Sequence, residues 1–312
     1  MDFIIAIDRY KREQNPVISE VFKKAFRSLV LSALCDNMAH IIKYQKFIIL
    51  LGVFLLFNAN QILAQPPDGY NPTPIWQDSF NQENIDTNKW YIYHLPKYKG
   101  TRGSGLFPEQ VSVDHIDGEN ALKLKASYDP SGYLRTGGIG TANLPMSGKP
   151  ANAKYEMHFG YIEIRVKFPK SNGMSFAFWL QSYGTHSVGN EGNDGMEIDI
   201  IETTELGSGR DIISQNLHWD GYKEHHVHVG MHRPFKGITD GHWHTVGLEW
   251  EKDMLKFYVD GQVTWKTIDG GISDVPEFIL LTLDAGWIDY PPTPGKLPDY
   301  AYVDWVKVYT KK

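Results

Sequence analysis

GMEIDIIE, residues 195–202, decides how this 312-residue chain is interpreted. Its carboxylates alternate with large apolar residues, which predicts a β-strand with one acidic and one apolar face, because successive strand side chains point to opposite sides. Glu197 and Asp199 share the acidic face. Strict alternation would next place a carboxylate at position 201, but Ile201 stands there and Glu202 follows. Glu202 therefore joins the acidic face only if the strand absorbs one extra residue in a β-bulge.

The spacing of Glu197 and Glu202 suits a pair of catalytic carboxylates. Four effective strand steps separate their backbones by roughly 13 Å, and both side chains reach inward. A gap near the roughly 5–5.5 Å of retaining glycosidases is then feasible, with Asp199 between them as a hydrogen-bond partner. The alternative is an ordinary solvated strand face. Aligned like charges repel, and Asp and Glu are poor strand formers, so the pattern favours the catalytic interpretation.

Residues 1–64 are expected to lie outside the fold. Lys43 and Lys46 precede an apolar run at 47–57, and Ala64 offers a cleavage point, which is the pattern of a secretory signal peptide. The apolar run is shorter than the roughly 20 residues of a transmembrane helix, although a single-span anchor is the alternative. The sequence predicts an exported protein, periplasmic, extracellular or on the cell surface, with no stable membrane insertion after signal removal.

Signal peptides begin at the initiator, yet 37 residues precede Met38. We therefore expect translation to start at Met38. The expected organisation is a gene-model extension at 1–37, a signal peptide at 38–64, an exposed proline-rich leader at 65–74 and one domain at 75–312.

Charge and cysteine content exclude several classes of function. Removing residues 1–64 removes eight Lys and Arg and five Asp and Glu, which leaves 23 basic and 32 acidic residues and a net charge near −9. That balance argues against a nucleic-acid or anionic-membrane partner. The only cysteine, Cys35, lies upstream of the expected start, so the mature chain has no thiol nucleophile and no cysteine zinc site.

The remaining 248 residues read as one short strand after another, without a long amphipathic helix or a repeat. Asp117-Gly118 and Asp260-Gly261 are hairpin turn signals between alternating runs. Regular strand and turn spacing of this kind predicts an all-β fold, a β-sandwich. Strands are expected within 110–126, 161–168, 174–181, 211–218, 244–250, 256–268, 277–283 and 302–309.

Several aromatic residues stand beside polar groups near expected strand ends. Sugar rings stack on indoles while their hydroxyls need polar partners, so such residues are candidate contacts for a long glycan. Ordinary core packing is the alternative for each of them. Alternation also places Phe176 and Phe178 opposite Trp179, in the core. The candidates for a cleft are Trp179, His218, Trp219, Tyr222 and Trp287.

GMEIDIIE resembles the E-x-D-x-x-E signature of glycoside hydrolase family 16, which includes laminarinases and licheninases. Further stretches resemble this family, in order from about residue 76 to 309: FGYIEIRVKFP (159–169), FAFWL (176–180), HWHTVGLEW (242–250), FYVDG (257–261) and VDWVKVY (303–309). The resemblance implies a concanavalin-like jelly roll, a β-sandwich of two curved antiparallel sheets with a concave substrate cleft.

The resemblance also implies a role for each carboxylate. Glu197 is the expected nucleophile, Glu202 the general acid/base and Asp199 the assisting carboxylate. Two nearby negative charges raise one of the two pKa values and so separate the roles, which agrees with this assignment. The extra residue before Glu202 matches the bulged branch of the family, with its laminarinases, agarases and carrageenases.

The expected substrate is a β-1,3- or mixed β-1,3/1,4-glucan, cleaved by an endo-acting monomer that needs no cofactor for catalysis. Many laminarinase relatives carry a Trp-Pro pair just before the signature, whereas this chain has NEGND at 190–194. A β-galactan such as agarose, porphyran or carrageenan is therefore the close rival. The family often holds a structural calcium ion, for which Asp304 is the expected side-chain ligand, with an ordinary strand-end aspartate as the alternative.

The sequence offers three alternatives to a glycoside hydrolase: a metal site, a serine hydrolase and a protein without catalytic activity. The histidines at 225, 226, 228 and 232 do not match a standard zinc spacing and are interpreted as loop residues near the cleft. Ser208 and Ser214 lie near histidines, but no G-x-S-x-G elbow accompanies them. A secreted lectin or a structural protein on the same sandwich is the remaining alternative, and it would not need the paired glutamates.

Overall fold

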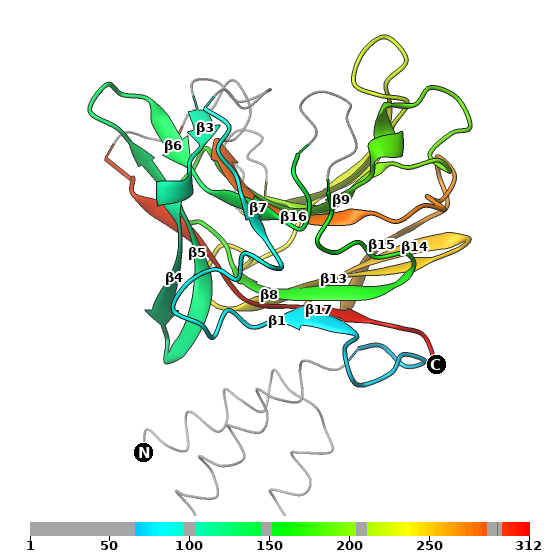
Figure 1. Ribbon diagram of the computed structural model, residues 1–312, viewed down its shortest axis with the longest axis horizontal. Helices are drawn as coiled ribbons and strands as arrows, with labels where there is room; N and C mark the ends of the chain where they lie inside the picture. Colours follow the sequence, from blue (N-terminus) through cyan, green and yellow to red (C-terminus); the bar gives the residue numbers. More distant parts are fainter. Residues whose placement is uncertain (1–65, 97–103, 145–151, 204–210, 286–291, 293–294) are drawn as a thin grey trace, which may run out of the picture. The chain divides into compact units, whose positions relative to one another are not determined.

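Two β-sheets pack face to face in this computed structural model, which confirms the expected β-sandwich (Figure 1). The structure describes residues 66–96, 104–144, 152–203, 211–285, 292 and 295–312. The expected gene-model extension at 1–37 and signal peptide at 38–64 lie outside these residues. The pairs between neighbouring strands are antiparallel except for one parallel pair, Ser104–Leu106 with Leu134–Thr136.

The larger sheet has ten strands among the described residues. Its order is β15 (Gln262–Thr267), β14 (Met254–Val259), β13 (His244–Glu251), β8 (Gly160–Lys167), β17 (Asp299–Tyr309), β5 (Glu119–Tyr128), β6 (Leu134–Thr136) and β3 (Ser104–Leu106), with β1 (Trp76–Asp78) on β17 and β4 (Val111–Ile116) on β5.

The second sheet has seven strands in the same part of the chain. Its order is β12 (Val227–Pro234), β11 (Ile212–Trp219), β10 (Glu197–Glu202), β9 (Met174–Gln181), β16 (Phe278–Ala285), β7 (Gly138–Gly140) and β2 (Tyr91–Ile92). Two short 3-10 helices, η1 (Pro108–Gln110) and η2 (Tyr183–His186), complete the described elements, and neither is long or apolar enough to cross a membrane.

Apolar side chains from both sheets form one core between them. Phe176 and Phe178 of β9 are fully buried there, as alternation predicted, together with Ile198 of β10. Ile164 of β8 and Leu248 of β13 supply the opposite side. Burying each such side chain contributes roughly 1.5–3 kcal/mol. The core therefore fixes which face of the seven-stranded sheet points away from it and is available to a ligand.

Two tight turns confirm the expected hairpins. Asp117 and Gly118 join β4 to β5, and Asp260 and Gly261 join β14 to β15, with positive φ at all four residues. Asp and Gly tolerate this left-handed conformation, which matches the twist of the flanking strands. The turn chemistry in the sequence was therefore sufficient to place both hairpins.

The segment before β1 is packed against the chain's end, which corrects the expectation of an exposed leader at 65–74. Tyr70 is 3% exposed and pairs with Lys311 in a β-bridge, and Asn71 donates its backbone N–H to the carbonyl of Thr310. The compact unit accordingly runs from Pro66 to Lys312 and not from residue 75. Proline content signalled an extended segment but not the aromatic anchor within it.

Candidate active site

The acidic strand β10 is an interior strand of the seven-stranded sheet, between β11 and β9, and contains the predicted bulge. Against β9, Asp199 pairs with Trp179 and Ile201 pairs with Phe178, so the register shifts by one residue at Ile200. Glu202 then pairs with Ala177, which lies on the same sheet face as Trp179. The extra residue brings all three carboxylates to the face directed away from the core.

Apolar packing behind β10 holds the three carboxylates in place. Ile198, Ile200 and Ile201 are all fully buried in the core between the sheets. Their burial, at roughly 1.5–3 kcal/mol each, anchors β10 to the core and leaves its acidic face directed away from it. Gly195, with φ 128°, leads into the strand, and a Cβ there would lie 1.8 Å from Oγ of Ser182.

Glu197 accepts two hydrogen bonds at one oxygen. Nε2 of Gln181 donates to Oε2 over 2.9 Å, and the hydroxyl of Tyr222 donates to the same atom. Gln181 is the cross-strand neighbour of Glu197 on β9, whereas Tyr222 comes from the loop between β11 and β12. Hydrogen bonds to a carboxylate favour its charged form, so both donors act to keep Glu197 ionised.

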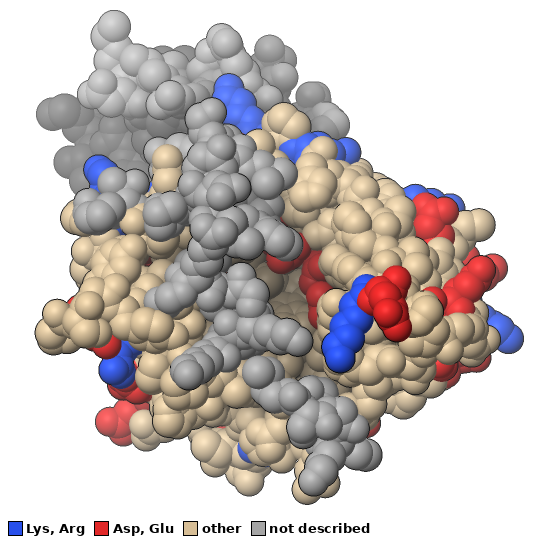
Figure 2. All heavy atoms as spheres, turned by 90° about the horizontal axis from the view of Figure 1, so that it is seen from above, with Lys and Arg blue, Asp and Glu red and all other residues tan. Residues whose placement is uncertain are grey.

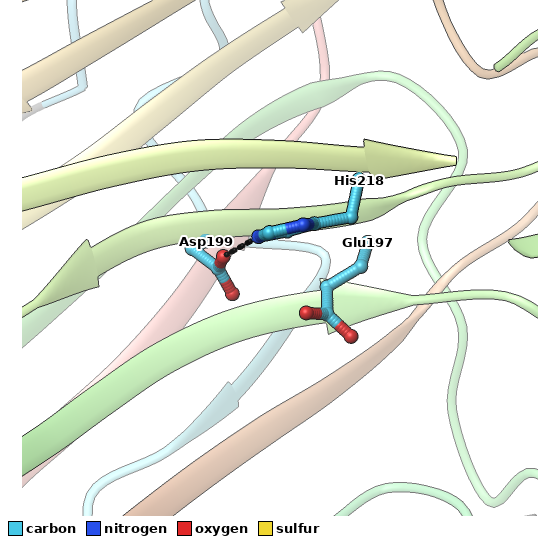
Figure 3. A group of neighbouring side chains, drawn as sticks. All are labelled: Glu197, Asp199 and His218. Atoms are coloured by element: carbon cyan, nitrogen blue, oxygen red, sulfur yellow. Dashed lines mark ion pairs between the residues drawn. The ribbon is translucent and has the colours of Figure 1, made fainter. Parts of the chain in front are cut away.

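Asp199 contacts His218, the first histidine of a short chain of imidazoles. Nε2 of His218 lies 3.2 Å from Oδ2 of Asp199, as Figure 3 shows beside Glu197. Nδ1 of His218 lies 2.9 Å from Nε2 of His226, and the ring of His218 also stacks on that of His228 at 4.9 Å between centroids. His218 therefore lies on the candidate site, as the sequence predicted.

Glu202 is held by Asn216 on β11. Nδ2 of Asn216 donates to Oε2 of Glu202 over 2.7 Å and to Oγ of Ser214 over 2.9 Å. Asn216 has room for this position because its neighbour on β12 is Gly230, where a Cβ would lie 2.1 Å from Oδ1 of Asn216. Each of the three carboxylates thus has its own partner on an adjacent strand or loop.

Burial is the main electrostatic influence on the trio. It raises the pKa of Glu197 and of Glu202 to about 8, with the charge of Asp199 adding to the effect, and raises the pKa of Asp199 to about 7. The trio therefore carries fewer than three charges at neutral pH, and its protons are lost in steps that belong to the group. A site that keeps one carboxyl protonated beside an ionised one can perform acid and nucleophilic chemistry together.

Figure 2 looks onto the face above the seven-stranded sheet and shows acidic atoms along the side of a hollow. Trp179 lies on this face, since it pairs with Asp199, but it is only 7% exposed and its indole donates to Thr282 Oγ1 over 3.2 Å. Contact between Trp179 and a glycan stays a prediction. Trp287 lies outside the described residues.

The expectation that Trp219 lines the cleft is wrong. It directly follows His218 on β11, so alternation sends it to the opposite face, where it belongs to the core and is 7% exposed. A Cβ at Gly270 would lie 2.6 Å from its ring, which shows how closely the indole is packed.

The histidine-rich stretch borders the site, as expected, but part of it is a strand. His226 lies in the loop before β12, whereas His228 and His232 belong to β12 and pair with His218 and Ser214. Within the described residues one group of possible metal ligands comes together, Glu197, Asp199 and His218, with ligand atoms within 4.8 Å of one another.

Asp304 does not fit the calcium role that the resemblance implied. It is 6% exposed, and its Oδ2 lies 2.5 Å from Nη1 of Arg165. A guanidinium already balances the charge that calcium would neutralise. In the described part of the chain Asp304 does not join any group of three acidic or histidine ligands.

Comparison with known proteins decides the family. The family model described as "Beta-porphyranase A-D, GH16 domain" matches residues 71–311. This chain belongs to glycoside hydrolase family 16. Its sandwich is accordingly the jelly roll of that family.

Curated relatives of this family 16 chain differ in their substrates. The glucan endo-1,3-beta-glucosidase A1 of Niallia circulans is 26% identical over 275 residues, which cover 76% of this chain and 38% of that protein. Beta-porphyranase B of Phocaeicola plebeius is 26% identical over 289 residues, which cover 79% of this chain and 87% of that protein. The chain thus spans well under two thirds of the Niallia protein.

Solved family 16 structures share the fold. The family 16 protein of the Bacteroides ovatus mixed linkage glucan PUL, determined in complex with a product, has a TM-score of 0.61 and 22% identity, and the match covers 75% of this chain and 99% of that one. Identity at this level supports the architecture alone.

Sequence reasoning missed two residues that hold the trio, Gln181 and Asn216. Alternation alone could have predicted Asn216, because it stands two residues before His218 and so shares its face. Gln181 ends a strand that was expected, but its pairing with Glu197 depends on the register across the bulge. Tyr222, placed near the cleft by its neighbours in the sequence, does contact Glu197.

Proposed function

We propose that this chain is an endo-acting retaining β-glycosidase. Glu197 attacks the anomeric carbon and forms a covalent glycosyl ester while Glu202 gives its proton to the leaving glycosidic oxygen. A water then attacks the ester as Glu202 takes the water's proton, so the product keeps its configuration and both carboxyls return to their initial state. Asp199, between Glu197 and Glu202 on the strand, is the assisting carboxylate.

The observation that carries this proposal is the bulge at Ile200, which turns Glu197, Asp199 and Glu202 to one face. Two donors on Glu197, against the single donor Asn216 on Glu202, support Glu197 as the ionised nucleophile and Glu202 as the proton donor.

For the substrate we propose a β-galactan of the porphyran type. The family model that matches residues 71–311 describes a porphyranase domain. This match supports a β-galactan over the β-glucan that the sequence led us to expect. A β-1,3- or mixed-linkage glucan is the second candidate, favoured by the name of the Niallia relative. We also propose that the protein is exported and monomeric, as expected from the sequence.

Digestion of a polysaccharide panel tests the proposal. We expect the purified chain to release short oligosaccharides from porphyran at least about tenfold faster than from laminarin, lichenan, barley glucan, agarose or carrageenan, since differing pocket contacts give discrimination of this order. Proton NMR of the first products should show the β-anomer before mutarotation. Faster release from laminarin would favour the second candidate, and binding without release from any glycan would favour a lectin.

Tyr222→Phe is expected to move the acidic limb of the pH–rate profile to higher pH. The hydroxyl of Tyr222 stabilises the ionised form of Glu197, so its removal raises the pKa of Glu197 and leaves less of the nucleophile charged at a given acidic pH. We expect kcat/KM on the cleaved glycan to fall about tenfold on the acidic side of the profile and less above its acidic limb.

Tyr128→Phe is the control for this prediction, since Tyr128 is an exposed residue that ends β5 and donates to Pro292. Its profile should match that of the wild type. A uniform loss at every pH in Tyr222→Phe would mean that Tyr222 serves glycan binding and does not tune Glu197.

A further inference from the structure

Gln215 is a polar side chain in an apolar layer. It is fully buried on β11, on the same strand face as Ile213 and Leu217, which belong to the core. Burying an amide without partners costs several kcal/mol in an apolar medium, so its presence needs a reason in the surrounding backbone.

The reason lies directly across the sheet, at the bulge of β10. Asp199 pairs with Asn216 and Glu202 pairs with Ser214, so Gln215 faces both Ile200 and Ile201. Ile200 is the one residue of β10 with no register partner on either neighbouring strand. A bulge disturbs the ladder at such a residue, and Nε2 of Gln215 donates to the carbonyl oxygen of Ile200 over 3.0 Å.

A residue of the other sheet orients the amide of Gln215. Oγ1 of Thr264 on β15 donates to Oε1 of Gln215 over 2.8 Å, and Thr264 is itself buried. Because Oε1 accepts from Thr264, Nε2 is the end that faces Ile200. The hydrogen-bonded series Thr264, Gln215 and Ile200 therefore connects the ten-stranded sheet to the bulge beneath the candidate active site.

We propose that Gln215 is a positioning residue that holds the bulge and thereby sets the place of Glu202 relative to Glu197. Asn216, its neighbour, contacts Glu202 from the cleft side, so β11 holds the glutamate on one face of the sheet and the bulge before it on the other. The effect of Gln215 on catalysis rests on the proposed function. The structural link between Gln215 and the bulge is independent of that function.

The register indicates which carboxylate depends on Gln215. Glu197, Ile198 and Asp199 keep regular pairs with both β9 and β11, and the shift begins only after Asp199. Loss of the bond from Gln215 should therefore displace Glu202 and leave Glu197 in place. A displacement near 1 Å costs up to about 100-fold in rate, while a reaction that does not need the acid is spared.

Gln215→Met tests this, because Met has a similar length and no donor. With the polysaccharide that the wild type cleaves, we expect kcat/KM to fall about 10- to 100-fold with little change in binding. With the 2,4-dinitrophenyl glycoside of the matching oligosaccharide, whose leaving group needs no proton, the loss should stay below about threefold. Thr264→Val, which frees the amide to turn, should show the same split with a smaller loss.

Hydrogen exchange provides a readout independent of activity. Backbone amides in peptides covering 196–203 should exchange about tenfold faster in Gln215→Met than in the wild type. The control is Gln110→Met, which removes another buried glutamine, one that accepts from Ser127 in the larger sheet. It should leave both the exchange of 196–203 and the ratio of the two substrates unchanged.

Unchanged exchange at 196–203 in Gln215→Met would overturn the link to the bulge. Equal losses of kcat/KM on both substrates would overturn the positioning of Glu202. A wild type without activity on any glycan would instead refute the proposed function, and the exchange comparison would still decide whether Gln215 holds the bulge.

Discussion

Glu197→Gln is expected to lower kcat on the cleaved polysaccharide by about 10⁴-fold or more while the protein still binds the glycan. The amide keeps the shape of the side chain but cannot form the glycosyl ester, and removing a nucleophile has effects of this size in other enzymes. Steady-state kinetics and isothermal titration with a substrate oligosaccharide measure the two quantities. This experiment distinguishes an enzyme from a lectin, because only an enzyme releases product and can lose that release in Glu197→Gln.

The same substitution should stabilise the fold at alkaline pH. Burial raises the pKa of Glu197 to about 8, so the folded chain keeps a proton that the unfolded chain loses above its ordinary pKa near 4.5. That stability is fully present below about pH 4.5 and is lost as the pH rises toward 8. Glutamine has no proton to lose, so we expect Glu197→Gln to melt about 3–6 °C above the wild type at pH 8 and close to it at pH 4.5.

Glu163→Gln is the matched control. Glu163 is 4% exposed on β8 in the other sheet, accepts a hydrogen bond from Tyr161, and has its pKa raised by burial to about 7. It should gain stability at pH 8 in the same way and keep full activity. Activity of Glu197→Gln within tenfold of the wild type would refute its role as nucleophile, whatever the melting temperatures.

Much of this architecture could be predicted because the deciding signals are local. Alternation around Ile198 gave the faces of β10, and the misplaced Glu202 required a bulge that the register confirms. Asp117 and Asp260 marked their hairpins by turn chemistry alone. These inferences depend only on residues adjacent in the chain.

The errors arose where the outcome depends on distant contacts or where alternation was not applied. Trp219 directly follows His218, and neighbours on a strand face opposite ways, so the two cannot both line the cleft. Tyr70 looked like part of a leader because its partner Lys311 is far away in the sequence. Gln215 could not be interpreted without knowing that the carbonyl of Ile200 lies across from it. A buried polar residue becomes informative only once the register is known.

Glu202→Ala should separate the acid step from the nucleophilic step. We expect kcat/KM on the polysaccharide to fall about 10³- to 10⁴-fold, because the leaving sugar oxygen needs a proton. With a 2,4-dinitrophenyl glycoside kcat/KM should be nearly unchanged, but kcat should fall, because no base remains to activate water against the glycosyl ester. Azide needs no base, so it should restore kcat and give a β-glycosyl azide, whose configuration NMR can read.

The pH dependence sharpens the assignment of Glu202. Its pKa is raised to about 8, so the wild type should lose kcat/KM on the polysaccharide as Glu202 is deprotonated above that pH. Glu202→Ala on the aryl glycoside should lack this alkaline limb. Because Asn216 holds Glu202 at 2.7 Å, Asn216→Ala should shift the limb to higher pH by removing a donor that favours the charged form. An α-configured azide product, or no azide effect at all, would contradict double displacement with Glu202 as acid and base.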